Sequence, residues 1–225
     1  MNMNANDFFA KALNKSLKDN AQLIFAKKIT ISLYSNDDVY TEIVDINEII
    51  PMNEYQSGIL CIFDNRTQFA LHLAKVDKCK LSIYFPLTRE KFIISANSFM
   101  INGIDCKEEN KFNINKVDIL NKKWEKLTTE EKLQFETVDK DSIKKETIDD
   151  LNKYIAQEKV EVSKNFSIGV FVATKYEYTV FPMPQVIANT RKMKFESLLK
   201  PHKMPNKFLM EYKEEEKEWK SVQLN

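Results

Sequence analysis

The first part of the chain shows a helical pattern of apolar residues followed by two extended ones. Apolar residues recur every three or four positions over residues 7–18, which is typical of an amphipathic helix. The period then changes to two over residues 28–34 and 39–46, and a turn-forming Ser-Asn-Asp-Asp cluster separates these segments. The pattern predicts an N-terminal helix followed by a β-hairpin.

The middle of the chain predicts a buried strand, a short helix and a second pair of strands. Residues 58–63 are almost wholly apolar, as expected for a strand that is covered on both faces. A helical pattern follows over residues 66–76. Residues 81–85 and 91–101 have strand character, and the turn-forming sequence Pro-Leu-Thr-Arg joins them.

The last part of the chain predicts more helix, a charged segment and several strands. Helical periodicity returns over residues 115–135 and restarts at Thr128, which begins a Thr-Thr-Glu-Glu capping box. Residues 137–164 are dense in charge and are interpreted as an exposed helix or a mobile excursion, not as a second domain. Strand-like segments follow at residues 166–173, 176–181, 186–199, 208–212 and 219–224.

Together these elements predict one domain of the α+β class that is mainly β. From these ten strand-like segments and the helical patterns we expect about eight strands and three or four helices. Most connections between successive strands are too short for a parallel crossover, so the sheet is expected to be antiparallel and curled into a barrel. A chain of 225 residues is long enough to bury one large core, and we expect a single domain over residues 1–225.

The composition of the chain bears on its cellular compartment and on the partners that it could bind. Lys and Arg number 34 against 33 Asp and Glu, so the charge gives no case for a nucleic-acid or anionic-membrane partner. The longest uncharged runs, residues 92–104 and 178–190, fall short of the roughly 20 residues of a membrane span. Three cysteines without a C-x-x-C pair suit a reducing compartment, and the N-terminus lacks a signal-peptide pattern. We therefore expect a cytoplasmic protein.

The signature motifs of several large functional classes are absent from the sequence. The three glycines, Gly58, Gly103 and Gly169, are too far apart to form a Gly-rich phosphate loop. The two histidines, His72 and His202, belong to no zinc-binding pattern, and no G-x-S-x-G elbow occurs. The sequence therefore predicts no metal site and assigns no catalytic residue.

The junction near residue 66 is the best candidate for ligand binding. A buried strand ends there, and Arg66 and Thr67 stand in or near the first turn of the predicted helix. Backbone amides, the positive helix end, a guanidinium and a hydroxyl would meet at one point, which is how proteins hold a phosphate. In the alternative interpretation, Asp64 only caps the helix and Arg66 is solvated.

The order of several motifs resembles one known family. Residues 66–101 read RTQFALHLAKVDKCKLSIYFPLTREKFIISANSFMI. This text is similar to the middle of the pyridoxamine 5'-phosphate oxidase-like, FMN-binding split-barrel family, in which a Thr-Asp-x-Arg-Ser-x-Lys segment leads through a helix and a strand to a Thr-Arg-Glu-Gln-Phe-Arg-like turn. Residues 123–135, 165–181, 188–195 and 219–225 resemble later segments of the family in the same order.

The resemblance implies a fold, an assembly and a set of contacts. The fold would be an antiparallel, six-stranded split β-barrel with flanking helices. The protein would be a homodimer with FMN bound in the dimer interface. The positions that match or replace family contacts to FMN are Arg66, Thr67, Gln68, Lys91 and Trp219.

The sequence also departs from the family at charged positions. Phe69 stands in place of the family's lysine, and Tyr40 and Asp45 fall where a family strand carries two arginines. A charge-assisted hydrogen bond contributes about 1.5–3 kcal/mol, so these losses would weaken phosphate binding.

Two functions therefore remain open. The chain is an FMN-dependent flavoprotein with oxidoreductase activity on an unknown substrate, or it is a non-catalytic split-barrel binding or interaction module that has lost its flavin site. The sequence alone leaves open whether it is an enzyme.

Overall fold

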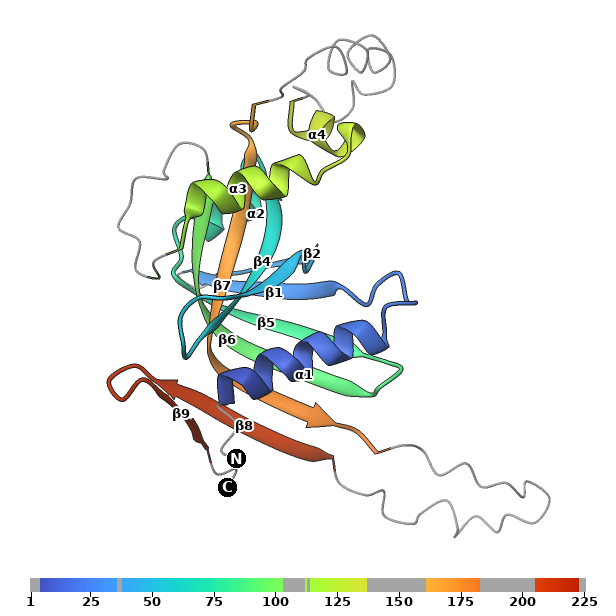
Figure 1. Ribbon diagram of the computed structural model, residues 1–225, viewed down its shortest axis with the longest axis vertical. Helices are drawn as coiled ribbons and strands as arrows, with labels where there is room; N and C mark the ends of the chain where they lie inside the picture. Colours follow the sequence, from blue (N-terminus) through green and yellow to red (C-terminus); the bar gives the residue numbers. More distant parts are fainter. Residues whose placement is uncertain are drawn as a thin grey trace, which may run out of the picture.

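The computed structural model describes residues 5–35, 38–102, 112, 114–136, 161–182 and 205–222. In this part of the chain four helices accompany nine strands (Figure 1). The helices are α1 (Ala5–Asp19), α2 (Gln68–Leu73), α3 (Lys116–Glu125) and α4 (Thr129–Glu136). The strands are β1 (Lys28–Ser35), β2 (Asp38–Asp45), β3 (Glu48–Pro51), β4 (Ser57–Asp64), β5 (Lys78–Phe85), β6 (Glu90–Asn102), β7 (Phe166–Val180), β8 (Asn206–Lys213) and β9 (Glu218–Ser221).

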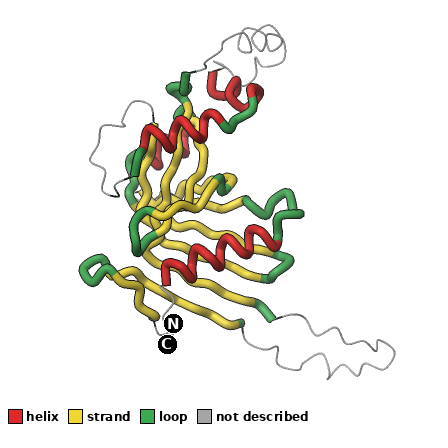
Figure 2. The backbone as a smooth tube through the Cα atoms, in the orientation of Figure 1, coloured by secondary structure: helices red, strands yellow, loops and turns green. Residues whose placement is uncertain are grey.

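All nine strands belong to one antiparallel sheet, which confirms the predicted fold class. The order is β2-β1-β5-β6-β7-β4-β3, and β8 pairs with both β7 and β9. The long strand β7 changes partner along its length: its first half pairs with β4 and its second half with β8, while β6 follows it throughout. The sheet is therefore strongly curved and open on one side, as Figure 2 shows.

The structure corrects two details of the predicted elements. Residues 166–173 and 176–181 are one continuous strand, because a register shift opposite Ser95 accommodates the extra residue Thr174 without breaking the pairing. Strand β3 adds to the six strands that the resemblance implied, as do β8 and β9, which extend the sheet from the second half of β7. The strand expected at residues 186–199, and most of the charged segment, lie outside the described residues.

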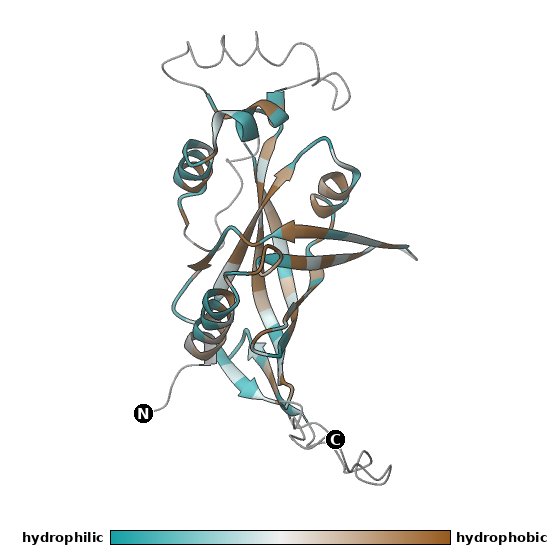
Figure 3. Ribbon diagram, turned by 90° about the vertical axis from the view of Figure 1, so that its right-hand side faces the viewer, coloured by the Kyte–Doolittle hydropathy of each residue, from teal (hydrophilic) through white to brown (hydrophobic). Residues whose placement is uncertain are grey.

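Two hydrophobic cores lie on the two faces of the sheet. Helix α1 packs Phe9 and Leu13 onto the inner faces of β1, β5 and β6. Helices α3 and α4 pack Trp124 and Phe135 around Phe166, near the other end of β7. Both cores need β4 and the first half of β7, which explains why these strands are apolar at nearly every position. Hydrophobic stretches, drawn in brown, dominate the strands at the centre of the sheet in Figure 3.

The outer face of β1, β2 and β5 is exposed. Alternate residues of these strands point away from the α1 core, because side chains alternate along a strand. Four large apolar or aromatic side chains of this face are at least half exposed: Tyr34, Val39, Ile43 and Tyr84.

Candidate functional site

The junction between β4 and α2 is built by local hydrogen bonds. Thr67 is the N-cap of α2: its backbone is extended, and its hydroxyl accepts a hydrogen bond from the Ala70 amide at 3.2 Å. The same hydroxyl donates to the Asp64 carbonyl at 2.9 Å. The Asp64 carboxylate accepts from the Arg66 amide at 2.9 Å and so closes the turn. Thr67 and not Asp64 is therefore the residue that caps this helix.

The Arg66 guanidinium is engaged by groups of its own chain. Its Nη2 lies 2.6 Å from Asp64 Oδ2, and its Nε lies 2.9 Å from Asp64 Oδ1. Nη2 also donates to the backbone carbonyl of Gln134, in α4, at 2.7 Å. The hydrogen bond to Asp64 raises the pKa of Arg66 above its already high usual value. Arg66 is thus charged, and the adjacent carboxylate balances that charge.

Arg66 belongs to a polar joint that holds the end of α4, which we call the α4 joint. The carbonyl of Phe135 accepts hydrogen bonds from Asn165 Nδ2 at 2.7 Å and Ser163 Oγ at 3.3 Å. Asn65 connects the same region to the β4–α2 turn, because its backbone N–H donates a hydrogen bond to the backbone carbonyl of Asn165 at 2.8 Å. The last carbonyls of a helix have no partner within the helix, and side-chain donors satisfy them here.

Three positions that the resemblance assigns to family cations, Phe69, Tyr40 and Asp45, carry no positive charge. Phe69 is 6% exposed and stacks on Phe63 with ring centroids 5.8 Å apart. Tyr40, on β2, stacks on His72 of α2 with a centroid separation of 3.6 Å. Asp45 forms an ion pair with Lys28 at 2.7 Å. Aromatic side chains and one carboxylate thus occupy the positions at which the family pattern has basic side chains.

The remaining predicted contacts lie on other elements. Gln68 is the first residue of α2 and is exposed. Lys91 lies on β6, opposite Tyr84 of β5 and Thr179 of β7. Trp219, on β9, donates from its indole Nε1 to the Tyr55 carbonyl at 2.7 Å.

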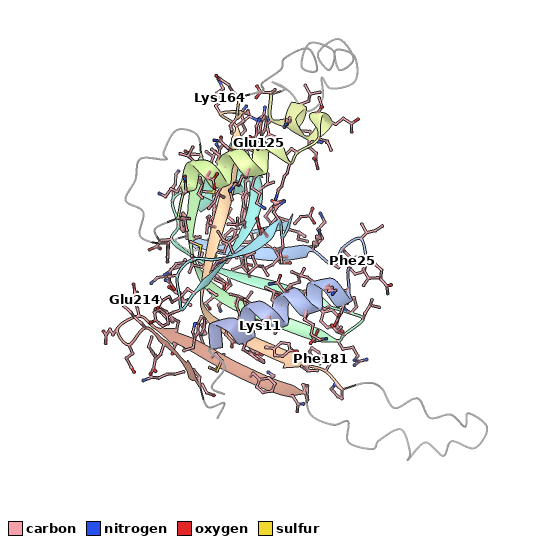
Figure 4. The ribbon with its side chains drawn as sticks, in the orientation of Figure 1. Lys11, Phe25, Glu125, Lys164, Phe181 and Glu214 are labelled. Atoms are coloured by element: carbon pink, nitrogen blue, oxygen red, sulfur yellow. The ribbon has the colours of Figure 1, made fainter. Side chains whose placement is uncertain are left out.

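A single copy of the chain does not bring these residues together. Asp64, two residues before Arg66, pairs with Phe166 at the start of β7, whereas Lys91 pairs with Thr179 near its end. At about 3.3 Å per residue the two ends are roughly 40 Å apart along the strand. Figure 4 shows Lys164, beside the α4 joint, and Glu214, in the β8–β9 turn near Trp219, toward opposite ends of the molecule. A shared site would need a second copy of the chain.

The β4–α2 junction does not fit the phosphate of FMN. Its guanidinium is balanced by Asp64, its hydroxyl already caps α2, and an apolar ring occupies the lysine position. A phosphate dianion placed here would meet the Asp64 carboxylate and would lack a free cation to balance it.

The sequence interpretation missed a polar cluster between α1 and the sheet. The Glu90 carboxylate accepts hydrogen bonds from Ser16 Oγ at 2.7 Å and from the Tyr178 hydroxyl. Burial, together with this bond, raises the pKa of Tyr178. A cavity of about 280 Å³ lies beside it, lined by Phe8, Lys11, Ala12, Lys15, Glu90 and Tyr178. The sequence does show that Ala12 and Ser16 are one helical turn apart and share a face of α1. It does not show that this face packs against Glu90.

The described parts of the chain contain neither a metal-ligand cluster nor a membrane-spanning helix. Within these ranges no group of three or more His, Cys, Asp or Glu residues is placed to hold a metal ion. None of the four helices combines the length and the apolar character that crossing a membrane requires.

Comparison with known proteins identifies the fold. No protein-family model matches the sequence, and no curated protein matches it significantly. Among solved structures, a pyridoxamine 5'-phosphate oxidase-related, FMN-binding protein from Nostoc punctiforme is similar to 96% of this chain and 97% of its own, with a TM-score of 0.67 and 17% identity. The chain has the split-barrel fold of this FMN-binding protein.

A second solved structure is similar to nearly the whole chain. PhzG from Burkholderia lata, solved with tetrahydrophenazine-1-carboxylic acid, matches 99% of this chain and 92% of its own, with a TM-score of 0.65 and 12% identity. The similarity to both proteins extends over nearly the whole split barrel and concerns its fold.

Proposed function

We propose that this protein is a non-catalytic split-barrel binding or interaction module that forms a homodimer and has lost the FMN site. The observation that carries the proposal is the engagement of Arg66 by Asp64 and the Gln134 carbonyl. Arg66 is the one arginine that the resemblance places at the phosphate, but its N–H groups bind Asp64 and the Gln134 carbonyl instead.

Neighbouring positions support the same conclusion. A buried phenylalanine replaces the family's lysine, and the Tyr40–His72 stack and Asp45 replace its two arginines. Each lost charge-assisted hydrogen bond removes about 1.5–3 kcal/mol of binding free energy. Three such losses weaken binding by at least about a thousandfold, because 1.4 kcal/mol corresponds to a factor of ten.

An FMN-dependent oxidoreductase is the second candidate, and the fold favours it. The similarity to an FMN-binding protein extends over 96% of this chain. In this case FMN would supply the redox chemistry. Arg66, Thr67 and Gln68 of one copy would contact it together with Lys91 and Trp219 of the second copy. Oxidation of pyridoxamine phosphate is not favoured, because no residue that would orient this substrate has been identified.

The visible absorption spectrum of the purified protein separates the two candidates. It should be recorded as isolated, and again after incubation with excess FMN followed by dialysis, with dialysed free FMN as the control. We expect a colourless protein that retains no flavin. A flavin spectrum that survives dialysis would refute the proposed function and establish the flavoprotein.

A further inference from the structure

The α4 joint gives Arg66 and its neighbours a role that differs from anion binding. Helix α4 has eight residues, which is too short to be stable in water without tertiary contacts. Its apolar contacts are made by Leu133 and Phe135, and the Phe135 ring packs edge-on against Trp124 and Phe166. These contacts bury the apolar side of α4, but they leave the backbone carbonyls of its last turn without a partner within the helix.

The last turn is held by side chains from two other segments. Arg66 reaches it from the β4–α2 turn and binds the Gln134 carbonyl, and Asn165 reaches it from the turn before β7 and binds the Phe135 carbonyl. A positive group near a helix C-terminus is also favoured by the helix dipole. Asp64 fixes the guanidinium in the required orientation, because its carboxylate accepts hydrogen bonds from both Nε and Nη2.

We infer that Arg66 is a positioning residue that caps the C-terminus of α4, with Asp64 holding it in place, and not an anchor for a phosphate. The inference rests on the proposed function, since it states what the former anchor does in a barrel that has lost FMN. It also explains why an arginine is retained at a position whose expected ligand contacts are otherwise gone.

Hydrogen exchange of the α4 amides in the full-length protein tests this role. In Arg66→Ala, and independently in Asn165→Ala, we expect the amides of α4 to exchange about tenfold faster or more, because each variant removes one strong cap. The amides of β1 and β5 should keep their wild-type rates. Lys122→Ala is the matched control: it removes an exposed cation that pairs with Asp118 on α3, and α4 should be unaffected.

Titration with FMN, riboflavin and inorganic phosphate completes the test. We expect Arg66→Ala and the wild type to have the same affinity, or the same lack of it, for all three. Faster exchange in α4 with unchanged affinities supports the inference, even if the wild type retains flavin through other residues and the proposed function fails. Unchanged exchange in α4, or a loss of FMN or phosphate affinity in Arg66→Ala, overturns it. If Arg66→Ala does not fold, Arg66→Lys replaces it: the charge remains, but the fork that binds Asp64 and Gln134 together is lost.

Discussion

At the residue scale, the polar side chains of the β4–α2 junction and of the cluster around Glu90 are engaged by their neighbours. Arg66 and Thr67 have the chemistry of a phosphate site, but their donors and acceptors close a turn and cap two helices. Tyr178 donates its hydroxyl to Glu90. Such engagement depends on partners that are distant in the sequence, such as Gln134 for Arg66, and so it could not be predicted from residue type.

The thiols of Cys61 and Cys79 should resist modification in the folded protein. Both are buried, and burial raises the pKa of both thiols, that of Cys79 to about 12. The thiolate is the reactive form, so both groups are unreactive near neutral pH. With iodoacetamide at pH 8, we expect peptide mass spectrometry to find both unmodified until denaturant is added. Rapid labelling of Cys61 in the native protein would contradict this.

At the element scale, one ion pair attaches α3 to the edge of the sheet. Lys123 Nζ lies 2.5 Å from Glu48 Oε2, and the lysine side chain is 9% exposed whereas the glutamate side chain is 46% exposed. Glu48 lies on the short strand β3, which the hydrophobic pattern did not reveal. A nearly buried lysine depends on this partner, because an unpaired charge in a core is strongly destabilising.

Removing the carboxylate should cost more stability than removing the lysine. We expect Glu48→Gln to lower the free energy of unfolding by about 1–2 kcal/mol, less than the loss for a fully buried pair because Glu48 is half exposed. Lys123→Met should be closer to the wild type, since it leaves no buried charge behind. Urea unfolding at pH 7 measures both, and a larger loss in Lys123→Met would contradict the argument.

The same pair predicts a pH dependence. The hydrogen bond from Lys123 lowers the pKa of Glu48 in the folded protein. The stabilisation that the ionised Glu48 contributes is therefore complete above the pKa of glutamate in the unfolded chain. It is lost as the pH falls through the lower pKa that Glu48 has in the folded protein. The difference in stability between the wild type and Glu48→Gln should shrink as the pH falls into this acidic range. A difference that stays constant down to the acid transition would refute the assignment.

At the scale of the whole molecule, the exposed outer face of β1, β2 and β5 is the candidate surface for dimerisation. Val39 is 58% exposed and Ile43 62%, and Tyr34 and Tyr84 extend the same face across β1 and β5. Burial of apolar surface is worth about 25 cal/mol per Å², and a stable interface covers about 1,000 Å² or more. A second copy of the chain on this face would accord with the proposed homodimer.

Light scattering after size exclusion should therefore give twice the mass of one chain. We expect Ile43→Glu to shift the protein toward the monomer, because a charge would be buried in the interface. Val117→Glu is the matched control, since Val117 is 52% exposed on α3, a helix whose main contacts with the sheet are to β6 and β7. A wild-type monomer, or an equal effect of both variants, would count against dimerisation through this face.

The sequence by itself determined much of the fold. The period of two over β1 and β2 and the apolar run of β4 predicted strands, and the helical period predicted α1, because these patterns match faces that must be buried. The order of the motifs also indicated the split barrel. The pattern could not show that residues 166–173 and 176–181 form one strand, since the shift at Thr174 depends on pairing with β6.

Only the tertiary structure decided what the candidate site contains. Sequence placed Arg66 and Thr67 at the end of a buried strand, as the structure confirms. It could not reveal that the Gln134 carbonyl would take a guanidinium donor, or that Tyr40 would stack on His72. The physical reason is that a residue's own pattern fixes which face it occupies, whereas the availability of its polar atoms depends on groups that the fold brings from elsewhere.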